Sequence, residues 1–426
     1  MRILIVSQHF WPENFRINDL AMNFSERGHD VTVLTGLPNY PEGSLHPDFK
    51  KNPDQFNSYH NVSIVRVPHV LRGNGKIRLA LNYLSFFLSA SIIGAWKLKK
   101  VKFDVIFVHA TSPITVAIPA IVMGRLKRAP VFLWVLDLWP ESLSAVGVVK
   151  SSKILSTVGL LVTWIYSKCD YILIQSRAFL ESVHNYCPAS ERPDKILYFP
   201  SWAEDVFGQA NSAKQDAIKR DNQFFTILFA GNIGVAQDFP SILDAAEALK
   251  GNKQIRWIIV GDGRHREWVA EQIKTRNLEQ IVQLVGRFPI ESMPAFFECA
   301  DALLVTLKTN EIFARTIPGK VQAYLASRRP IIGMIDGEAR RVLDESGGAM
   351  TCESGASADL VKIVEKMAHF SSEELIAMAR NGRSYYEQNF DRDRLFDKLE
   401  SYFASAISGE VLLNSPTTLS ERYREK

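Results

Sequence analysis

Short, uninterrupted apolar runs recur along this chain, and each is followed by a polar or glycine-containing turn and then by a helical segment. A continuous apolar run such as Ile3–Ser7 predicts a strand that is buried on both faces of a parallel sheet. Strands that alternate with helices predict an α/β fold, because the helices cover the two faces of the sheet. The predicted strands are Ile3–Ser7, Val31–Thr35, Val62–Val67, Asp104–Val108, Val131–Leu136, Tyr171–Gln175, Ile196–Phe199, Thr226–Ala230, Ile255–Val260, Val282–Val285, Ala302–Thr306 and Ile331–Met334.

The alternation runs in two series that are separated by a polar segment, Pro200–Asn222. A chain of 426 residues is too long for one typical domain, and its 46% hydrophobic and 23% charged residues are typical of a folded globular protein. We therefore expect one α/β domain over residues 1–200 and a second over 201–385. In the remaining segment, 386–426, a C-terminal helix would pack back on the first domain and a polar tail would follow.

Charge and cysteine content exclude several classes of protein. The formal net charge is only +4, and the chain has no arginine-rich arm, zinc-ligand spacing or aromatic-basic repeat, which argues against nucleic acid as a partner. The cysteines are scattered without a CxxC pair at Cys169, Cys187, Cys299 and Cys352. This pattern indicates a reducing compartment and neither a metal site nor disulfides. Since the N-terminus also lacks a secretory pattern, the predicted location is cytoplasmic.

The stretch Val305–Ile332 predicts an anion site. It is interpreted as a strand end, a polar loop over Leu307–Ile317 and a helix that starts near Pro318, with proline at the first helical position. The charged and polar side chains that crowd this turn are Lys308, Asn310, Glu311 and Lys320. Free N–H groups and the positive end of a helix favour phosphate there. The alternative is an ordinary strand–loop–helix connection with solvated charges.

Three other strands of the second series end in glycine turns, which carry Gly231, Asn232 and Gly234, then Gly261, then Gly286 and Arg287. Glycine lets a backbone approach a ligand closely, and the helix that follows favours phosphate. One such turn is weak support. Together with the loop of Lys308, Asn310 and Glu311, however, these three turns make four potential ligand-binding turns in one domain, which predicts a nucleotide site.

The first turn of the chain has a different character. It lacks the G-x-G-x-x-G pattern of dinucleotide sites and carries polar residues instead, among them Asn14, Arg16 and Asn18. His109 and Asp137 are predicted at the carboxyl ends of neighbouring strands, where ligands bind in open α/β sheets. We interpret this edge as a binding surface, and the alternative is a helix cap with a solvated loop.

An apolar segment, Leu79–Trp96, has no charged residue and has lysines or arginines on both sides. Its length is at the lower limit for crossing a bilayer. Basic flanks and aromatic residues favour a helix that lies on the membrane surface. A core helix of the domain is the alternative, and we expect a helix that does both, packing on the sheet while exposing an apolar and basic rim. A transmembrane span is the least favoured.

Taken together, the motifs resemble those of glycosyltransferase family 4, and in particular the bacterial L-fucosamine-type transferases of O-antigen and capsule assembly. The resemblance rests on SQHFWPENFRINDLA, RGHDVTVLTGLPNYPEG, DLWPES, FAGNIGVAQDF, VGDGRHRE and TIPGKVQAYLASRRPI, which occur in this order. It implies a GT-B fold of two Rossmann-like, doubly wound parallel-sheet domains that face a cleft. The first domain would bind an acceptor, and the second a nucleotide-sugar that is usually UDP-linked. It also implies retention of anomeric configuration, and neither a metal nor another cofactor is required.

The resemblance implies roles for individual residues. Catalytic roles fall on Asp137, close to the transferred sugar, on Glu311, toward its hydroxyls, and on Lys308. The usual basic residues of the first glycine turn are replaced by Asn232 and Gln237, so Lys308, Lys320 and possible help from Arg16 would neutralise the diphosphate. A second family glutamate falls at Ala323, which leaves Gln322 or Glu338 for the ribose. The nucleotide-sugar set is Gly231, Asn232, Gly234, Gln237, Gly261, Arg287, Asn310, Lys320 and Gln322, and the acceptor set is Asn14, Arg16, Asn18 and His109.

The expected activity is transfer of a sugar, such as an N-acetylated deoxyhexosamine, from a nucleotide-sugar to a lipid-linked (undecaprenyl-diphosphate) saccharide. The enzyme would work at the inner face of the cytoplasmic membrane in surface-polysaccharide synthesis. Two alternatives remain open. One is a nucleotide-sugar 2-epimerase of similar architecture, and the other is a non-catalytic scaffold of a polysaccharide assembly complex.

Overall fold

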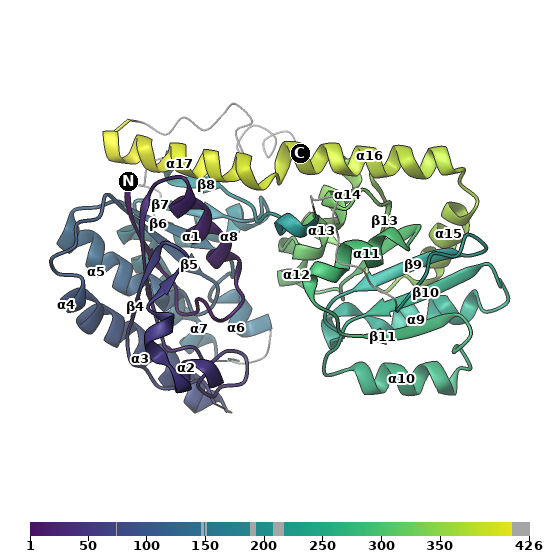
Figure 1. Cartoon of the computed structure of the whole chain (residues 1–426), viewed down its shortest axis with the longest axis horizontal. Coiled ribbons are helices and arrows are strands. Elements are labelled where there is room, and N and C mark those ends of the chain that lie inside the picture. Colours follow the sequence, from purple (N-terminus) through teal and green to yellow (C-terminus); the bar gives the residue numbers. More distant parts are fainter. Residues whose placement is uncertain (74, 146–148, 150, 188–192, 208–216, 411–426) are drawn as a thin grey trace. The chain divides into compact units, whose positions relative to one another are not determined.

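A computed structural model describes residues 1–426 apart from 74, 146–148, 150, 188–192, 208–216 and 411–426. The chain divides into two compact units (Figure 1). The first unit contains Met1–Phe199 together with Phe396–Lys426, and the second contains Pro200–Leu395. Most of the predicted polar tail and the middle of the predicted linker lie outside the described residues.

In the first unit, the described strands form one eight-stranded sheet in the order β3-β4-β2-β1-β5-β6-β7-β8. The strands are β1 (Arg2–Val6), β2 (Asp30–Thr35), β3 (Ser58–Tyr59), β4 (Val62–Arg66), β5 (Val105–Ala110), β6 (Val131–Val135), β7 (Tyr171–Ile174) and β8 (Ile196–Tyr198). Neighbouring strands are parallel except for β3 and β4. In register, Ile3 lies beside Val31 on one side and Val105 on the other, so the carboxyl ends of these strands reach the same edge.

Helices cover this sheet on both faces, as the uninterrupted apolar runs predict. They are α1 (Arg16–Glu26), α2 (Pro47–Lys51), α3 (Lys76–Ser89), α4 (Ala95–Lys97), α5 (Ala117–Lys127), α6 (Glu141–Ala145), α7 (Ser152–Lys168) and α8 (Phe179–Tyr186). A π-helical turn, Ala90–Gly94, joins α3 to α4. The strands supply fully buried side chains such as Leu4, Ile106 and Leu133 to the core, which is why they tolerate no polar alternation.

The C-terminal helix α17 (Arg392–Ser408) supplies the last part of the first unit. The ring of Phe403 lies 5.8 Å from Phe24, 5.9 Å from Phe107 and 4.9 Å from Phe132, measured between centroids. Arg27 donates to Asp397 at 2.5 Å at the rim of this contact. The far end of the chain therefore completes the core of the unit that begins with residue 1.

In the second unit, the described strands form a parallel sheet in the order β11-β10-β9-β12-β13-β14. The strands are β9 (Phe225–Ala230), β10 (Ile255–Val260), β11 (Val282–Gly286), β12 (Ala302–Thr306), β13 (Ile331–Met334) and β14 (Ala349–Cys352). The helices are α9 (Phe239–Ala248), α10 (Arg266–Thr275), α11 (Met293–Glu298), α12 (Glu311–Arg315), α13 (Gly319–Ala326), α14 (Gly337–Ser346), α15 (Ser357–Ala368) and α16 (Ser372–Asn389).

The predicted strands are confirmed, with small shifts at their ends, but other expectations are wrong. Strand β14 was not expected, because its sequence, AMTC, is short and only partly apolar. The helical sequence between Ala358 and Tyr386 contains two helices, α15 and α16. Ser371 separates them by capping α16, where its Oγ accepts from the Glu374 N–H at 3.2 Å and its own N–H donates to the Glu374 carboxylate at 2.7 Å.

Candidate functional site

Glycine-lined turns gather at the carboxyl edge of the second sheet. A Cβ atom on Gly261 would lie 1.9 Å from the Gly231 carbonyl oxygen, and one on Gly263 would lie 2.3 Å from the Ile233 carbonyl oxygen. All three glycines also have positive φ, so other residues are excluded both by space and by backbone conformation. A cavity of about 480 Å³ lies at these turns and is lined by Gly231, Asn232, Val260, Gly261, Asp262, Gly263, Arg287, Phe288 and Met293.

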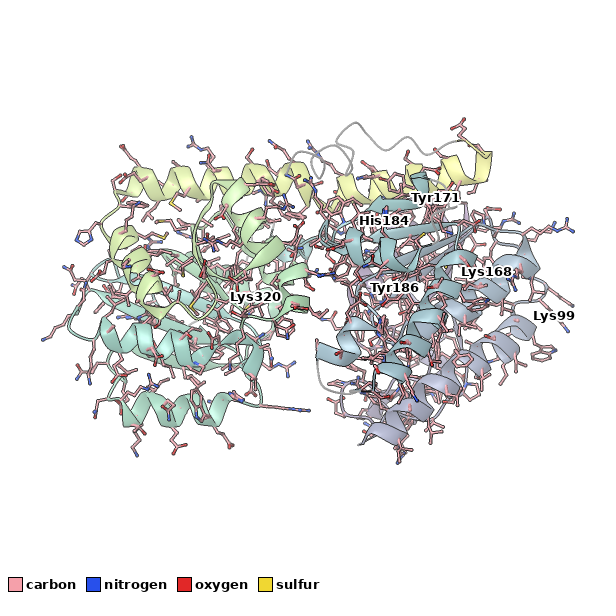
Figure 2. All side chains as sticks on the ribbon, turned by 180° about the vertical axis from the view of Figure 1, so that it is seen from behind. Lys99, Lys168, Tyr171, His184, Tyr186 and Lys320 are labelled. Carbon is pink, nitrogen blue, oxygen red and sulfur yellow. The ribbon has the colours of Figure 1, made fainter. Side chains whose placement is uncertain are left out.

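Lys320, labelled in Figure 2, lies in the first turn of α13, and its Nζ would lie 3.0 Å from a Cβ on Gly231. Its Nζ lies 3.5 Å from the centroid of the Phe229 ring. A Cβ on Gly231 would meet Lys320 Cε at 2.5 Å, so the glycine makes room for the lysine. The Nζ atom is buried and has no hydrogen-bond partner among the described residues.

Burial lowers the pKa of Lys320 to about 7. An ammonium in such a place has lost its water shell, and a cation–π contact replaces only part of it. An anionic ligand would restore the missing interaction. The second unit thus holds a cation site that is prepared for an anion.

The loop before α13 differs from the prediction. It contains the short helix α12, and Asn310 caps it by accepting from the Ile312 N–H at 2.9 Å. Pro318 is the N-cap of α13 with extended backbone and not its first helical residue, which is Gly319. The Asn310 side-chain oxygen is therefore occupied by the backbone, whereas the side chain of Glu311, at the start of α12, is exposed.

Backbone contacts bring the loop of Lys308 to the first glycine turn. The Lys308 N–H donates to the Ala236 carbonyl at 2.8 Å, and Thr306 Oγ1 donates to the Gln237 carbonyl at 2.5 Å. Gln237 also accepts from the Gly234 N–H at 3.1 Å through its side chain. Gln237 thus closes the turn that carries Asn232, and the Asn232 side chain remains exposed beside the cavity.

The two residues considered for the ribose have different surroundings. Gln322 is buried on α13, and its Oε1 has no hydrogen-bond partner among the described residues. Glu338 is also buried, but it is joined to Arg341 at 2.7 Å. The positive charge of Arg341 already satisfies that carboxylate. Arg287, by contrast, is exposed at the wall of the cavity.

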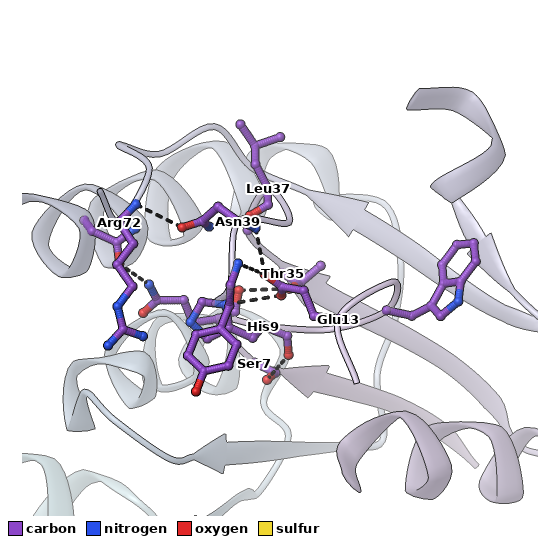
Figure 3. Close-up of polar contacts among 12 residues, drawn as sticks. Ser7, His9, Glu13, Thr35, Leu37, Asn39 and Arg72 are labelled. Atoms are coloured by element: carbon purple, nitrogen blue, oxygen red, sulfur yellow. Dashed lines mark hydrogen bonds and ion pairs between the residues drawn. The ribbon is translucent and has the colours of Figure 1, made fainter. Parts of the chain in front are cut away.

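At the carboxyl edge of the first sheet, Glu13 organises a buried polar network (Figure 3). One oxygen of its carboxylate accepts from the N–H groups of Asn39 and Tyr40 at 2.7 Å and 2.6 Å. Its other oxygen lies 3.2 Å from Nδ1 of His9, whose ring stacks on Phe15. Glu13 therefore fixes the loop after β2 against the loop after β1, a role that the sequence did not indicate.

The residues predicted for the acceptor have different surroundings. Arg16 and Asn18 lie in the first turn of α1, and Asn14, in the loop before it, is exposed. Asn18 is buried and donates to the Glu13 carbonyl at 2.7 Å. His109 is buried and lies 3.1 Å from Ser7 Oγ, and burial lowers its pKa to about 3, which keeps the ring neutral.

Asp137, just past the end of β6, lies at this edge in a hydrogen-bonded setting. It accepts from the Ser142 hydroxyl, and burial raises its pKa while hydrogen bonds from Ser142, Ser112 and Trp139 oppose that shift. The Trp139 indole N–H donates to Ser112 Oγ at 3.3 Å. Asp137 therefore has polar neighbours from α6 and from the turn after β5.

A single described helical segment, Ile77–Lys97, is long and apolar enough to cross a membrane, with a mean hydropathy of 1.5. Its inner side packs on the unit through Asn82, Phe86 and Ala90, which are buried. Its outer side exposes large apolar residues at intervals of three or four positions, namely Ile77, Leu81, Leu84, Leu88, Ile92 and Trp96. We call these six residues the apolar face of α3–α4.

Neighbouring helices extend this surface. Helix α5 contacts both α3 and α7, and it exposes Leu126, while α7 exposes Ile154, Leu160 and Trp164. Exposed basic residues surround these helices, including Lys99 and Lys168 (Figure 2). The segment thus packs on the core with one side and exposes an apolar surface on the other, while its place at a membrane stays a prediction.

Comparison with known proteins defines the class. Residues 225–369 match the family model described as "Glycosyl transferases group 1", so the second unit carries a domain of that kind. The two mostly parallel α/β units are those of the GT-B fold, as the solved structures below show. The protein is therefore a glycosyltransferase of the GT-B fold.

The relatives are distant in sequence. An Escherichia coli (strain K12) protein, whose name places it in colanic acid biosynthesis as the glycosyl transferase WcaI, is 24% identical over 347 residues, which cover 76% of this chain and 81% of that protein. HepE of Anabaena, solved with UDP and glucose, has a TM-score of 0.63 at 16% identity and covers 95% of this chain and 100% of its own. An α,α-trehalose-phosphate synthase (UDP-forming) from Burkholderia vietnamiensis has a TM-score of 0.69 at 14% identity, with coverage of 95% and 97%.

Proposed function

We propose that the protein transfers a sugar from a UDP-linked nucleotide-sugar to a lipid-linked saccharide in the synthesis of a cell-surface polysaccharide such as O-antigen or capsule. The observation that carries the proposal is the Lys320 ammonium, buried and unpartnered beside the glycine turns of the second unit. A nucleoside diphosphate supplies the negative charge that this site lacks. The neighbouring cavity of about 480 Å³ is of a size that suits a nucleoside.

Charge stabilisation is the main chemical demand of such a transfer. When the sugar C–O bond breaks, negative charge collects on the departing diphosphate. A preorganised cation in a site without water stabilises that charge more than water does. Lys320, with Lys308 as a second candidate, would supply it, while Glu311 would bind sugar hydroxyls and Asp137 would lie near the transferred sugar. We propose that the reaction retains the anomeric configuration and requires no metal.

The choice of UDP and of a polysaccharide product is supported by relatives. HepE was solved with UDP and glucose and with UDP-glucose, and the relative WcaI is named for colanic acid biosynthesis. These facts concern those proteins, and their low identity leaves the donor of this chain to be measured. An N-acetylated deoxyhexosamine is the sugar class that the sequence resemblance favours.

A lipid-linked acceptor is supported by the apolar face of α3–α4. Six large apolar side chains on one side of a helix, with basic residues around them, suit the interface of an anionic membrane. We propose that the first unit attaches peripherally to the inner face of the cytoplasmic membrane, where a lipid-linked saccharide is available.

The test is a transfer assay with a panel of UDP-, GDP- and dTDP-sugars and an undecaprenyl-diphosphate-linked saccharide, in which the lipid-linked product is measured. We expect product from at least one UDP-sugar, formed with the same anomeric configuration as the donor and in the presence of EDTA. Isomerised nucleotide-sugar without transfer would instead identify an epimerase. No reaction with any donor, together with intact membrane binding, would indicate a scaffold.

A further inference from the structure

Arg72, in the loop before α3, is a cation that the protein positions but does not neutralise. Its backbone N–H donates to Asn39 Oδ1 at 2.9 Å, and the two residues are joined in Figure 3. Its guanidinium carbon lies 5.2 Å from the centroid of the Tyr40 ring. Within the described residues, no salt bridge joins Arg72 to a carboxylate. A guanidinium held in this way keeps its N–H donors for a planar or tetrahedral anion.

The loops around Arg72 are held rigidly. Asn39 also donates to the Leu37 carbonyl at 2.8 Å, and its N–H is bound to the Glu13 carboxylate. Tyr40 is anchored by the same carboxylate through its own N–H. These bonds hold the backbone of Arg72 and of Tyr40, so the loop itself would lose little conformational entropy on binding an anion.

The apolar face of α3–α4 begins on the adjacent helix. Arg72 precedes α3 by four residues, and Ile77, the first exposed apolar residue of the face, is 79% exposed. Asn82 ties the helix to the same loop, because it donates to the Val70 carbonyl at 2.6 Å. A polyprenyl diphosphate likewise joins an apolar chain directly to an anionic group.

We propose that Arg72, together with Tyr40, binds the diphosphate of a polyprenyl-diphosphate acceptor whose chain lies along the apolar face of α3–α4. This inference rests on the proposed function for the identity of the acceptor, but the binding itself can be measured without transfer. The role is distinct from that of Lys320, which serves the diphosphate of the donor. Arg72 would set acceptor specificity.

The primary experiment measures binding of sugar-free polyprenyl diphosphate in vesicles of neutral phosphatidylcholine. We expect Arg72→Ala to weaken this binding by about tenfold or more, as loss of a charge-assisted, bidentate contact does. Arg72→Lys should recover only part of it, because an ammonium lacks the forked geometry. Arg125→Ala, which removes an exposed arginine from α5, is the matched control and should bind as wild type.

Three comparisons separate this role from others. Sedimentation with vesicles that contain phosphatidylglycerol should be unchanged in Arg72→Ala, whereas a loss there would show that Arg72 serves bulk anionic lipid, and the proposal would fail. In transfer assays, Arg72→Ala should raise KM for the diphosphate-linked acceptor but not for the same saccharide on an alkyl chain. An equal effect on both acceptors, or unchanged polyprenyl-diphosphate binding, would also overturn the proposal. If wild type binds the lipid diphosphate but transfers no sugar, the proposed function fails and this inference stands.

Discussion

The two units place different chemistry at the carboxyl edges of their sheets. In the second unit the edge is built from backbone, with glycine turns and two buried polar atoms, Lys320 Nζ and Gln322 Oε1, that have no partner among the described residues. In the first unit the edge is built from side chains, and Glu13 and His9 are already bonded to each other. The second edge presents a buried cation beside glycine turns, whereas the first is a network of bonded side chains in which Arg72 has no salt bridge to a described carboxylate.

The units also differ in how they are assembled. The second is one continuous run of chain, while the first depends on α17 from the far end of the sequence. A donor site made from local turns needs only its own unit. The carboxyl edge of the first unit depends on contacts between residues that are distant in sequence. We therefore expect the stability of the first unit to respond more strongly to substitutions far from this edge, such as those in α17.

The largest expected effect tests this dependence. Phe403→Ala removes a buried ring that touches Phe24, Phe107 and Phe132, and we expect it to lower the free energy of unfolding of the first unit by about 3–5 kcal/mol. Nucleotide binding by the second unit should be unchanged at low temperature. Calorimetry and titration with UDP measure the two effects. If Phe403→Ala and the milder Phe403→Leu both unfold like wild type, the returning helix does not complete the core.

The next effect concerns the unpartnered cation. Lys320→Ala and Lys320→Met should lower turnover by about 10²–10³-fold, because the charge on the leaving diphosphate is no longer neutralised. Neither variant should be less stable without ligand, since a buried charge without a partner does not favour the folded state. Lys274→Ala, an exposed lysine of α10, is the control. Full turnover in Lys320→Met would move the diphosphate away from the glycine turns.

On the other edge, Glu13→Ala leaves the N–H groups of Asn39 and Tyr40 without an acceptor. We expect a loss of about 2 kcal/mol in the stability of the first unit, since buried donors without a partner are costly. The KM for acceptor should rise, while UDP affinity should not change. Glu42→Ala, an exposed glutamate in the same loop, is the control and should change neither quantity.

The smallest effect is the pH dependence of donor binding. The pKa of Lys320 is about 7 in the folded protein, against 10.5 for an ordinary lysine. Between these values the unfolded chain holds a proton that the unliganded native state lacks, so this group makes the unliganded protein more stable as pH rises. A bound diphosphate favours the charged lysine, so binding takes up a proton and UDP affinity should fall above pH 7, by about tenfold per unit at most.

Calorimetric titration in two buffers of different ionisation enthalpy measures this proton uptake directly. The Lys320→Met variant is the reference, and its UDP affinity should lack the decline between pH 7 and 9. The same decline in both proteins would assign the pH dependence to the nucleotide or to another group, and Lys320 would then be charged before the donor binds.

The sequence alone determined the fold class, the positions of nearly all strands and the turn in which Lys320 lies. These features are local: an uninterrupted apolar run is buried on both sides wherever it occurs, and a glycine at a strand end permits one kind of turn. The domain of residues 225–369 confirms the class that the motifs indicated. Strand β14 and the break at Ser371 were missed because their patterns are short and weak.

Only the tertiary structure decided which of the predicted polar residues face a ligand. Asn18, Asn310 and Gln237 are residue types that commonly bind ligands. In the structure, however, the Asn18 amide N–H and the side-chain oxygens of Asn310 and Gln237 are bonded to nearby backbone. Arg72 carries no motif, yet the fold places it beside Tyr40 with no salt bridge to any carboxylate in the described part of the chain. A polar side chain is available to a ligand only when no other group of the protein bonds to it. Those competing groups often belong to loops that are distant in the sequence, so only the tertiary structure decides.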